Sequence, residues 1–297
     1  MAAGQVGFIG LGAMGDGQAK NLIKAGFVVR AFDIDPAAVE SVVAAGGVRA
    51  ESPAEAAREV DLLFVLVFTA AQAEAVLFGA QGAVTTLPSG ATVVLHTTGR
   101  PEDAAAFEER LAESGHLMLD APVTGGKSGA DSGSLTIIAS GPERAFNAAE
   151  AAFQAMSKTV YRVGDKAGAA SKIKMINQLL VGIHGVAMAE ALTLAARAGA
   201  DPKVVYDVIT HGVGNSTVFE RLGPFVLENN FEPRGVTDIL IKDLGIVAET
   251  SKALDLELPL AAVALQQYLA AGERGLSRAD FTSVIKLYEQ DPDAEAV

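Results

Sequence analysis

A lysine and two amides lie close together in a long apolar segment of the sequence. Asn177 follows Lys174 by three positions, and Gln178 comes directly after Asn177. On an α-helix this spacing keeps Asn177 and Gln178 each within about 60° of Lys174, so the three share one face. Lys172 would project about 160° away from Lys174, toward a different face.

These residue types suit the oxidation of an alcohol. A buried lysine amine with a lowered pKa can take the proton of a hydroxyl group while a hydride leaves the same carbon. A neighbouring amide can hold the hydroxyl or a carboxylate of the substrate. The alternative is that Lys174 only extends its charged end from a long helix toward solvent. The triplet by itself leaves both interpretations open.

A glycine-rich loop follows the first apolar run of the chain. Its pattern is G-x-G-x-x-G, and a predicted helix comes directly after it. Glycine permits the tight turn, the close approach of a pyrophosphate and the packing of helix on strand, while backbone amides face the anion. The alternative is a glycine-rich turn without a ligand. The predicted dinucleotide-binding residues are Gly10, Leu11, Gly12, Ala13, Met14 and Gly15.

Asp33 ends the second apolar run, roughly twenty residues after the last glycine of the loop, where an acidic residue can bind the adenosine ribose. A carboxylate at this point repels the 2′-phosphate of NADP, so we expect NAD to be preferred. Arg30 lies on the alternate face of the predicted strand and is poorly placed to bind that phosphate. The alternative is that Asp33 only forms a turn over residues 33–36.

The elements that would position these residues change character along the chain. In the first half, short apolar runs alternate with helical stretches, which predicts a doubly wound, Rossmann-type α/β domain with a parallel sheet. After about residue 165 the periodicity is helical throughout, which predicts an all-α C-terminal domain. We therefore expect an NAD-binding domain at residues 1–164 and a helical substrate and oligomerisation domain at residues 165–297. Predicted strands cover residues 6–10, 28–33, 62–67, 92–96, 117–120, 135–140 and 160–163, and predicted helices include residues 14–25, 36–45 and 168–200.

The composition excludes several kinds of protein and site. The 297 residues include no cysteine, which rules out disulfides, thiolate nucleophiles and cysteine metal sites. The four histidines lack the spacing of metal ligands, so we expect no metal. The formal net charge of −13 is the reverse of what nucleic acids and anionic membranes attract, and we expect neither partner.

Two further features predict a soluble protein of the cytoplasm. The longest apolar stretch, residues 179–198, is interrupted by polar residues such as His184 and Glu190, as in a buried helix rather than a membrane span. No leader pattern precedes the first predicted strand.

Four motifs, in order, resemble those of the β-hydroxyacid dehydrogenase family, which includes 3-hydroxyisobutyrate dehydrogenase, tartronate semialdehyde reductase, L-threonate dehydrogenase and the 6-phosphogluconate dehydrogenases. The resemblance covers nearly the whole chain. The motifs are the glycine loop at residues 6–15, Asp120-Ala121-Pro122-Val123-Thr124-Gly125-Gly126, residues 168–178, and Ile241-Lys242-Asp243-Leu244.

The resemblance implies roles for individual residues. Lys174 would be the catalytic acid/base, with Asn177 beside it. Lys242 would close over the nicotinamide end of the cofactor. The other cofactor residues that it implies are Val67, Phe68 and Thr98, although residues 67–69 depart from the family's usual Met-Leu-Pro. The substrate-binding residues that it implies are Thr124, Gly125, Gly126, Asn177 and Gln178.

The resemblance also implies a substrate class and an assembly. The second half of the sequence is most similar to the family's L-threonate branch, which implies oxidation of a four-carbon acid sugar to a 2-keto acid. Reduction of tartronate semialdehyde or oxidation of 3-hydroxyisobutyrate would use the same residues. Members of the family usually associate through the helical half, so we expect a homodimer or homotetramer.

The sequence leaves two alternative functions and the role of one lysine undecided. Imine reductases share the architecture but usually lack the lysine, so Lys174 counts against them. A catalytically inactive NAD-binding scaffold is the alternative from a different class. Lys127, after the glycine pair, either lies on the surface or serves a more acidic substrate, and we favour the surface.

Overall fold

The computed structural model describes residues 4–289. The chain divides into two compact units, Met1–Met175 and Ile176–Val297. The division falls inside helix α8 (Ala169–Arg197), whose start is hydrogen-bonded to the sheet of the first unit.

The first unit is built on one sheet with the strand order β3-β2-β1-β4-β5-β6-β8-β7, in which β9 pairs with β8. The strands are β1 (Gln5–Ile9), β2 (Val28–Phe32), β3 (Val48–Arg49), β4 (Leu62–Val65), β5 (Thr92–Leu95), β6 (Leu117–Asp120), β7 (Val123–Thr124), β8 (Leu135–Ser140) and β9 (Ser157–Gly164). Strands β1 to β6 are joined by parallel pairings, which confirms the Rossmann-type prediction. The antiparallel pairings of β8 with β6 and β7 were not predicted.

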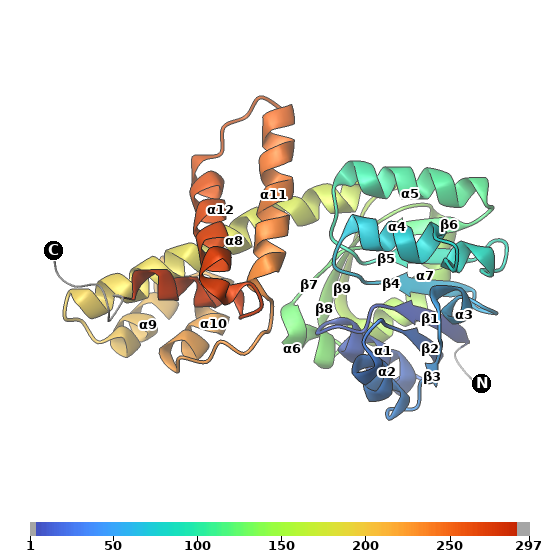
Figure 1. The fold of residues 1–297 in the computed structure, drawn as a ribbon, viewed down its shortest axis with the longest axis horizontal. Helices are drawn as coiled ribbons and strands as arrows, with labels where there is room; N and C mark the ends of the chain where they lie inside the picture. The colour runs from blue at the N-terminus through green and yellow to red at the C-terminus, as the bar shows by residue number, and fades with distance from the viewer. Residues whose placement is uncertain (1–3, 290–297) are drawn as a thin grey trace. The chain divides into compact units, whose positions relative to one another are not determined.

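Helices cover both faces of this sheet (Figure 1). One face carries α1 (Gly15–Lys24), α2 (Pro36–Val43) and α7 (Glu143–Met156), and the other carries α3 (Pro53–Ala56), α4 (Ala70–Phe78) and α5 (Pro101–Glu113). Successive strand residues face alternate cores: Phe64 packs in the first core and Val65 in the second. Because both faces are buried, the strands read as continuous apolar runs.

The chain reverses its direction of sheet growth at β1, which has β2 on one side and β4 on the other. In an open parallel sheet, such a point leaves a crevice beyond the carboxyl ends of the strands. The loops that carry Gly10, Asp33 and Val67 all follow carboxyl ends of these strands. The fold therefore gathers the predicted cofactor residues at one edge of the sheet.

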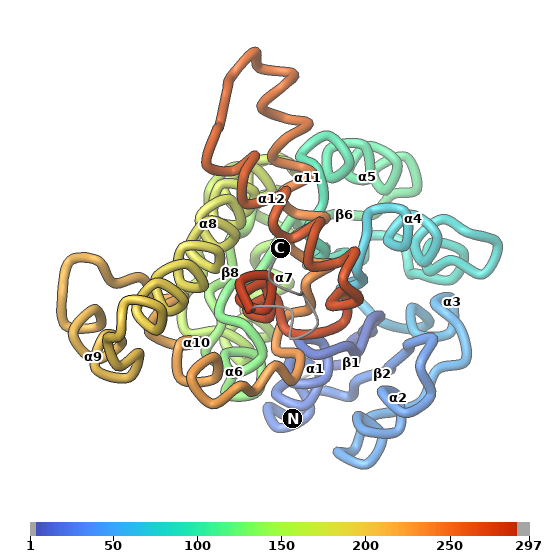
Figure 2. Tube along the Cα trace, turned by 60° about the vertical axis from the view of Figure 1, so that its left-hand side comes forward, coloured from blue at the N-terminus to red at the C-terminus, as the bar shows by residue number. Residues whose placement is uncertain are grey.

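The second unit contains helices only among its described elements, as predicted for the C-terminal half. Apart from α8 they are α9 (Pro202–Thr210), α10 (Thr217–Leu227), α11 (Thr237–Ala253), α12 (Pro259–Ala271) and the short helical segments η2 (Gly272–Leu276) and η3 (Phe281–Tyr288). Helices α11 and α12 lie side by side, as do α9 and α10 (Figures 1 and 2).

Helix α8 is long and apolar enough to cross a membrane, judged by length and composition. Its packing explains this composition differently. A Cβ on Gly185 would lie 2.2 Å from the Tyr268 hydroxyl of α12, and a Cβ on Gly182 would lie 2.8 Å from Leu244 of α11. These close approaches require glycine, so this part of α8 packs closely against α11 and α12, as a core helix does.

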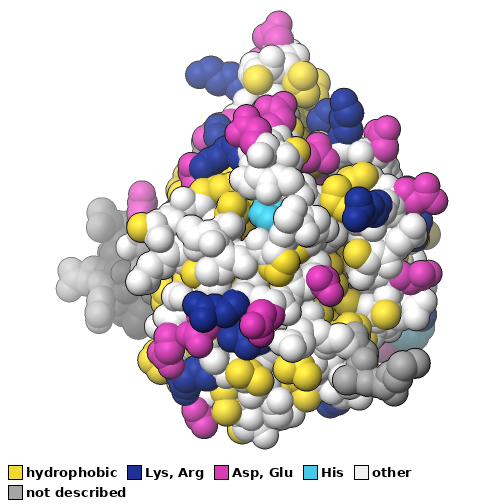
Figure 3. All heavy atoms as spheres, turned by 90° about the vertical axis from the view of Figure 1, so that its right-hand side faces the viewer, with side chains coloured by type: hydrophobic (Ala, Val, Ile, Leu, Met, Phe, Trp, Pro, Cys, Tyr) yellow, Lys and Arg dark blue, Asp and Glu magenta, His cyan; other side chains and the backbone are white. Residues whose placement is uncertain are grey.

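The surface carries mixed charges. On the face shown in Figure 3, lysine and arginine side chains lie among aspartate and glutamate side chains and form no continuous basic area. Interspersed charges of this kind are typical of a soluble domain.

Candidate active site

The three glycines of the N-terminal loop are required for different reasons. Gly10 has φ +95°, and a Cβ there would lie 2.1 Å from the carbonyl oxygen of Leu66. A Cβ on Gly15 would lie 2.0 Å from the carbonyl oxygen of Gly10. A Cβ on Gly12 would meet no atom of the protein within 4 Å. The fold therefore demands Gly10 and Gly15, whereas the open space at Gly12 suits a ligand that approaches the backbone.

The start of helix α1 fits an anion. Its N-cap residue, Met14, supplies no side-chain hydrogen bond, so the backbone amides of the first turn have no capping side chain. Asp16 lies in this turn, but its carboxylate forms an ion pair with Lys20 at 2.8 Å. Amides at a helix start bind phosphate groups well, so the loop and α1 together fit the pyrophosphate of a dinucleotide.

Asp33 is hydrogen-bonded to the glycine loop. Its Oδ2 accepts a hydrogen bond of 2.6 Å from the backbone N–H of Leu11, and its Oδ1 accepts one of 2.9 Å from that of Asp35. The bond to Asp35 forms the turn that was the alternative role predicted for Asp33. The bond to Leu11 joins the same carboxylate to the glycine loop. Arg30 donates to the carbonyl of Glu55 and so is directed toward α3.

The two other predicted cofactor loops are joined to each other. The backbone N–H of Val67 donates to the hydroxyl of Thr97 at 3.0 Å. Thr97 is buried, whereas Thr98 is partly exposed, which favours Thr98 for contact with a cofactor. Phe68 precedes a capping box in which Thr69 and Gln72 begin helix α4.

The predicted substrate loop lies beside helix α1. Thr124 belongs to β7, and Gly125 and Gly126 adopt positive φ values of +131° and +66° before helix α6 (Gly126–Asp131). Helix α6 packs on α1, where Asn21 donates a hydrogen bond of 2.7 Å to the carbonyl of Ala130. The first unit therefore brings the substrate loop and the dinucleotide loop together.

Lys127 forms an exposed ion pair with Asp131 at 2.7 Å, one turn further along α6. This contact supports the interpretation of Lys127 as a surface residue.

The lysine and the two amides lie on α8 as their spacing requires. Lys174 is only 7 % exposed, while Lys172 is exposed. The amide of Asn177 donates to Oε1 of Gln178 at 3.0 Å.

Helix α11 supplies a carboxylate to this group of amides. Nε2 of Gln178 donates to Oδ2 of Asp243 at 2.5 Å, and Nζ of Lys242 lies 2.7 Å from Oδ1 of the same residue. Asp243 is 2 % exposed. The motif that contains it drew attention only to Lys242, although a buried acid beside a lysine could have been suspected from it.

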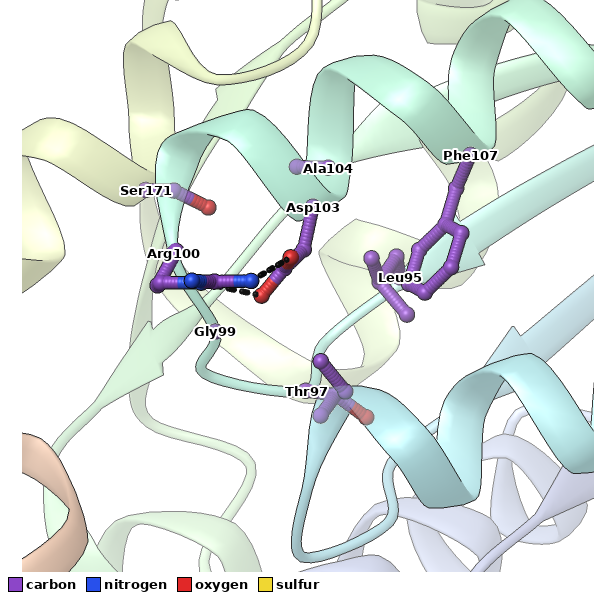
Figure 4. A pocket seen from close by; sticks show the side chains of 9 residues that line it. Leu95, Thr97, Gly99, Arg100, Asp103, Ala104, Phe107 and Ser171 are labelled. Atoms are coloured by element: carbon purple, nitrogen blue, oxygen red, sulfur yellow. Dashed lines mark hydrogen bonds and ion pairs between the residues drawn. The ribbon is translucent and has the colours of Figure 1, made fainter. Parts of the chain in front are cut away.

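A small cavity lies beneath the start of α5 (Figure 4). Its lining includes Thr97, Phe107 and Ser171, beside the ion pair of Arg100 with Asp103. Its volume of about 10 Å³ has room for one water molecule, so neither a cofactor nor a substrate fits it.

His96 and Asp120 were not assigned a role from the sequence. His96 is wholly buried between Phe64 and Phe153, and its Nδ1–H donates to the carbonyl of Ala121 in the substrate loop. Asp120 is wholly buried at the end of β6 and is bonded to the start of α8. No sequence pattern showed these partners, because they lie far apart along the chain. Within residues 4–289 no three histidine, aspartate or glutamate side chains gather as metal ligands would.

The sequence matches two family models. Residues 5–164 match the NAD binding domain of 6-phosphogluconate dehydrogenase, and residues 168–288 match the NAD-binding domain of NADP-dependent 3-hydroxyisobutyrate dehydrogenase. Together the models cover nearly all of the described chain.

Individual relatives match over almost their whole length. An L-threonate dehydrogenase of Cupriavidus necator is 46 % identical over 283 residues, which are 95 % of each chain. A 2-hydroxy-3-oxopropionate reductase of Escherichia coli is 32 % identical over 285 residues, 96 % of this chain and 97 % of the relative. The crystal structure of a 3-hydroxyisobutyrate dehydrogenase from Salmonella typhimurium superposes with a TM-score of 0.90 at 42 % identity, covering 95 % of this chain and 99 % of that one.

Burial lowers the pKa of His96 to about 4, so the acid stability of the protein should depend on this residue. As pH falls below the ordinary histidine pKa of 6.5, the unfolded chain takes up a proton that the folded chain does not accept. His96 should therefore lower the free energy of unfolding by about 2 kcal/mol between pH 7 and pH 5. Urea unfolding at both pH values measures this loss.

His96→Phe should remove most of that loss relative to the native chain. His211→Phe, at an exposed position, is the matched control and should leave it in place. The same pH dependence in His96→Phe as in the native chain would contradict the assignment.

Proposed function

The chain belongs to the β-hydroxyacid dehydrogenase family, and we propose that it oxidises a small hydroxy acid with NAD, using Lys174 as the general acid/base. Membership makes the protein an NAD(P)-binding oxidoreductase that acts on CH–OH groups. The observation that carries the rest of the proposal is the burial of Lys174 in the compact unit that also holds the glycine loop and residues 124–126.

The chain's own residues suit each part of this reaction. The open backbone at Gly12 and the amides that begin α1 suit the pyrophosphate, and Asp33 suits the ribose hydroxyls. Residues 124–126 offer a hydroxyl and backbone amides to the substrate carboxylate. Val67, Phe68, Thr98 and Lys242 remain cofactor-binding predictions.

Lys174 performs the proton transfer in this proposal. In the oxidation its neutral amine accepts the proton of the substrate hydroxyl, and in the reduction its ammonium returns a proton to the alkoxide. Asn177 positions the hydroxyl, and Gln178 supports Asn177 through their hydrogen bond. When bound, the nicotinamide ring exchanges a hydride with the carbon that bears the hydroxyl.

The proposed substrate is L-threonate or a related four-carbon acid sugar, oxidised at its 2-hydroxyl. The support is the 46 % identity with an L-threonate dehydrogenase. A solved structure of similar identity has the name 3-hydroxyisobutyrate dehydrogenase, and a more distant relative is a 2-hydroxy-3-oxopropionate reductase. These two substrates are therefore the alternatives to test.

The assembly and location are also proposals. Ile173, Ile176 and Leu180 are exposed and lie on neighbouring turns of α8. An exposed apolar stripe supports association of α8 with another subunit, in a homodimer or homotetramer. A cytoplasmic location remains a prediction.

Initial rates with NAD on a panel of C3 to C5 hydroxy acids should be highest for L-threonate. The panel includes its stereoisomer D-threonate, 3-hydroxyisobutyrate and glycerate, with tartronate semialdehyde and NADH in the reverse direction. A higher kcat/KM for 3-hydroxyisobutyrate or for tartronate semialdehyde would contradict L-threonate as the substrate. It would not affect the proposed role of Lys174.

Lys174→Ala should lower kcat by about 10²- to 10⁴-fold, because the proton acceptor is lost, while the Kd for NAD changes little. Stopped-flow rates and NADH fluorescence titration measure the two quantities. Lys172→Ala, two residues away and exposed, is the matched control and should keep the native kcat. A near-native kcat in Lys174→Ala would remove Lys174 from the mechanism, and native protein that binds NAD without turnover on any acid would support the scaffold alternative.

Asp33→Asn should raise the ratio of kcat/KM with NADP to kcat/KM with NAD by roughly tenfold, because one charge that repels the 2′-phosphate is lost. The amide oxygen can still accept the hydrogen bond of Leu11. An unchanged ratio would show that Asp33 acts only in its turn.

A further inference from the structure

The start of helix α8 has no cap from its own segment. Residues 166–168 are Lys, Ala and Gly, which have no short oxygen-bearing side chain to accept hydrogen bonds from the first turn. Gly168 has φ +94°, which directs the chain abruptly into the helix. The exposed amides of this turn must therefore be bonded by residues from elsewhere in the fold.

Asp120 supplies these bonds. Its Oδ2 accepts hydrogen bonds from the backbone N–H of Gly168 at 2.8 Å and of Ser171 at 2.9 Å. Its Oδ1 accepts a third, of 2.8 Å, from the hydroxyl of Ser171. The carboxylate is wholly buried, and this burial raises its pKa while the bonds to Ser171 and Gly168 oppose the rise.

A second strand end takes part in the same contact. Ser140 faces Asp120 across the β6 and β8 pairing, and its hydroxyl accepts a hydrogen bond of 3.1 Å from the backbone N–H of Ala170. On another side, a Cβ on Gly168 would lie 2.9 Å from the carbonyl oxygen of Pro101, at the start of α5. The first turn of α8 is thus fixed to β6 and β8 and packs closely on α5.

We propose that Asp120 is the positioning residue for Lys174: its carboxylate fixes the first turn of α8 and so sets where Lys174 stands relative to the substrate loop. The proposal rests on the proposed function of Lys174. Lys174 follows Ser171 by three residues, about one turn and about 4.5 Å along the helix axis. Any shift of Ser171 is therefore passed to the backbone of Lys174.

The position of Asp120 in the sequence gives this contact its functional meaning. Asp120 is the last residue of β6, directly before the segment that leads to Thr124, so one carboxylate joins the start of the substrate loop to the helix of the proton acceptor. Ser171 also lines the cavity that Thr97 and Gly99 line, next to the predicted cofactor residue Thr98 (Figure 4). All these residues belong to the first compact unit. Misplacement of a reacting group by about 1 Å can cost about 100-fold in rate.

Three substitutions test the proposal. Asp120→Ala removes all three bonds and should lower kcat by about 10- to 100-fold with little change in the Kd for NAD. Asp120→Asn keeps the shape, since its oxygen can accept both N–H groups and its NH₂ can donate to the hydroxyl oxygen of Ser171. It should recover most of the lost kcat. Ser171→Ala removes only the hydrogen bond from the Ser171 hydroxyl and should lower kcat severalfold. It tests the proposal even if Asp120→Ala does not fold.

Asp280→Asn is the matched control for loss of a buried carboxylate. Asp280 is wholly buried and accepts hydrogen bonds from backbone N–H groups of Arg234, Gly235 and Thr282, none of which is a predicted site residue. It should lower the melting temperature without lowering kcat. If Asp120→Ala and Ser171→Ala lower the melting temperature in the same way and leave kcat native, the proposal is overturned.

Hydrogen exchange separates failure of this proposal from failure of the proposed function. In Asp120→Ala the amides of Gly168 and Ser171 should exchange faster than in native protein, a result that needs no turnover. Unchanged exchange would overturn the positioning role even if Lys174→Ala is inactive. Faster exchange together with a fully active Lys174→Ala would show that Asp120 fixes the helix but that Lys174 is not the proton acceptor, which overturns the proposed function and with it the role of Asp120.

Discussion

The hydrogen bonds between a buried carboxylate and the start of α8 are the contact on which the candidate site depends. Asp120 stands at the carboxyl end of β6, so the helix that carries Lys174 begins where the sheet's loops converge. A buried carboxylate is costly unless its lone pairs are satisfied, and here backbone amides and a hydroxyl satisfy them. The same bonds hold the start of α8 to the sheet of the first unit.

The other end of the site follows from the geometry of the sheet. The sheet grows in both directions from β1, a topology in which ligands bind beyond the carboxyl ends of the strands, and the glycine loop follows the carboxyl end of β1. A side chain would meet the backbone of Leu66 at Gly10 and the backbone of Gly10 at Gly15, whereas Gly12 has open space. Packing and ligand binding thus require glycine at different positions of one motif.

The second unit holds four polar side chains that are linked to one another. Asn177, Gln178, Asp243 and Lys242 are linked in that order by two hydrogen bonds and an ion pair. Linked polar groups hold one another in place, so the hydrogen bond to Gln178 orients the amide of Asn177. The partner of Gln178 is 65 residues away in sequence, and no local periodicity could have indicated it.

The sequence by itself determined the elements and the chemistry that depend on local spacing. Short apolar runs located most of the parallel strands, helical periodicity located α8, the glycines located the dinucleotide loop, and helical spacing separated Lys174 from Lys172. Strands β3 and β7, of two residues each, were too short for any pattern to show. Only the tertiary structure decided which residues cap α8, which carbonyl His96 binds and which acid holds Gln178. These contacts join residues from separate elements, and their partners are chosen by how the elements pack, not by neighbours along the chain.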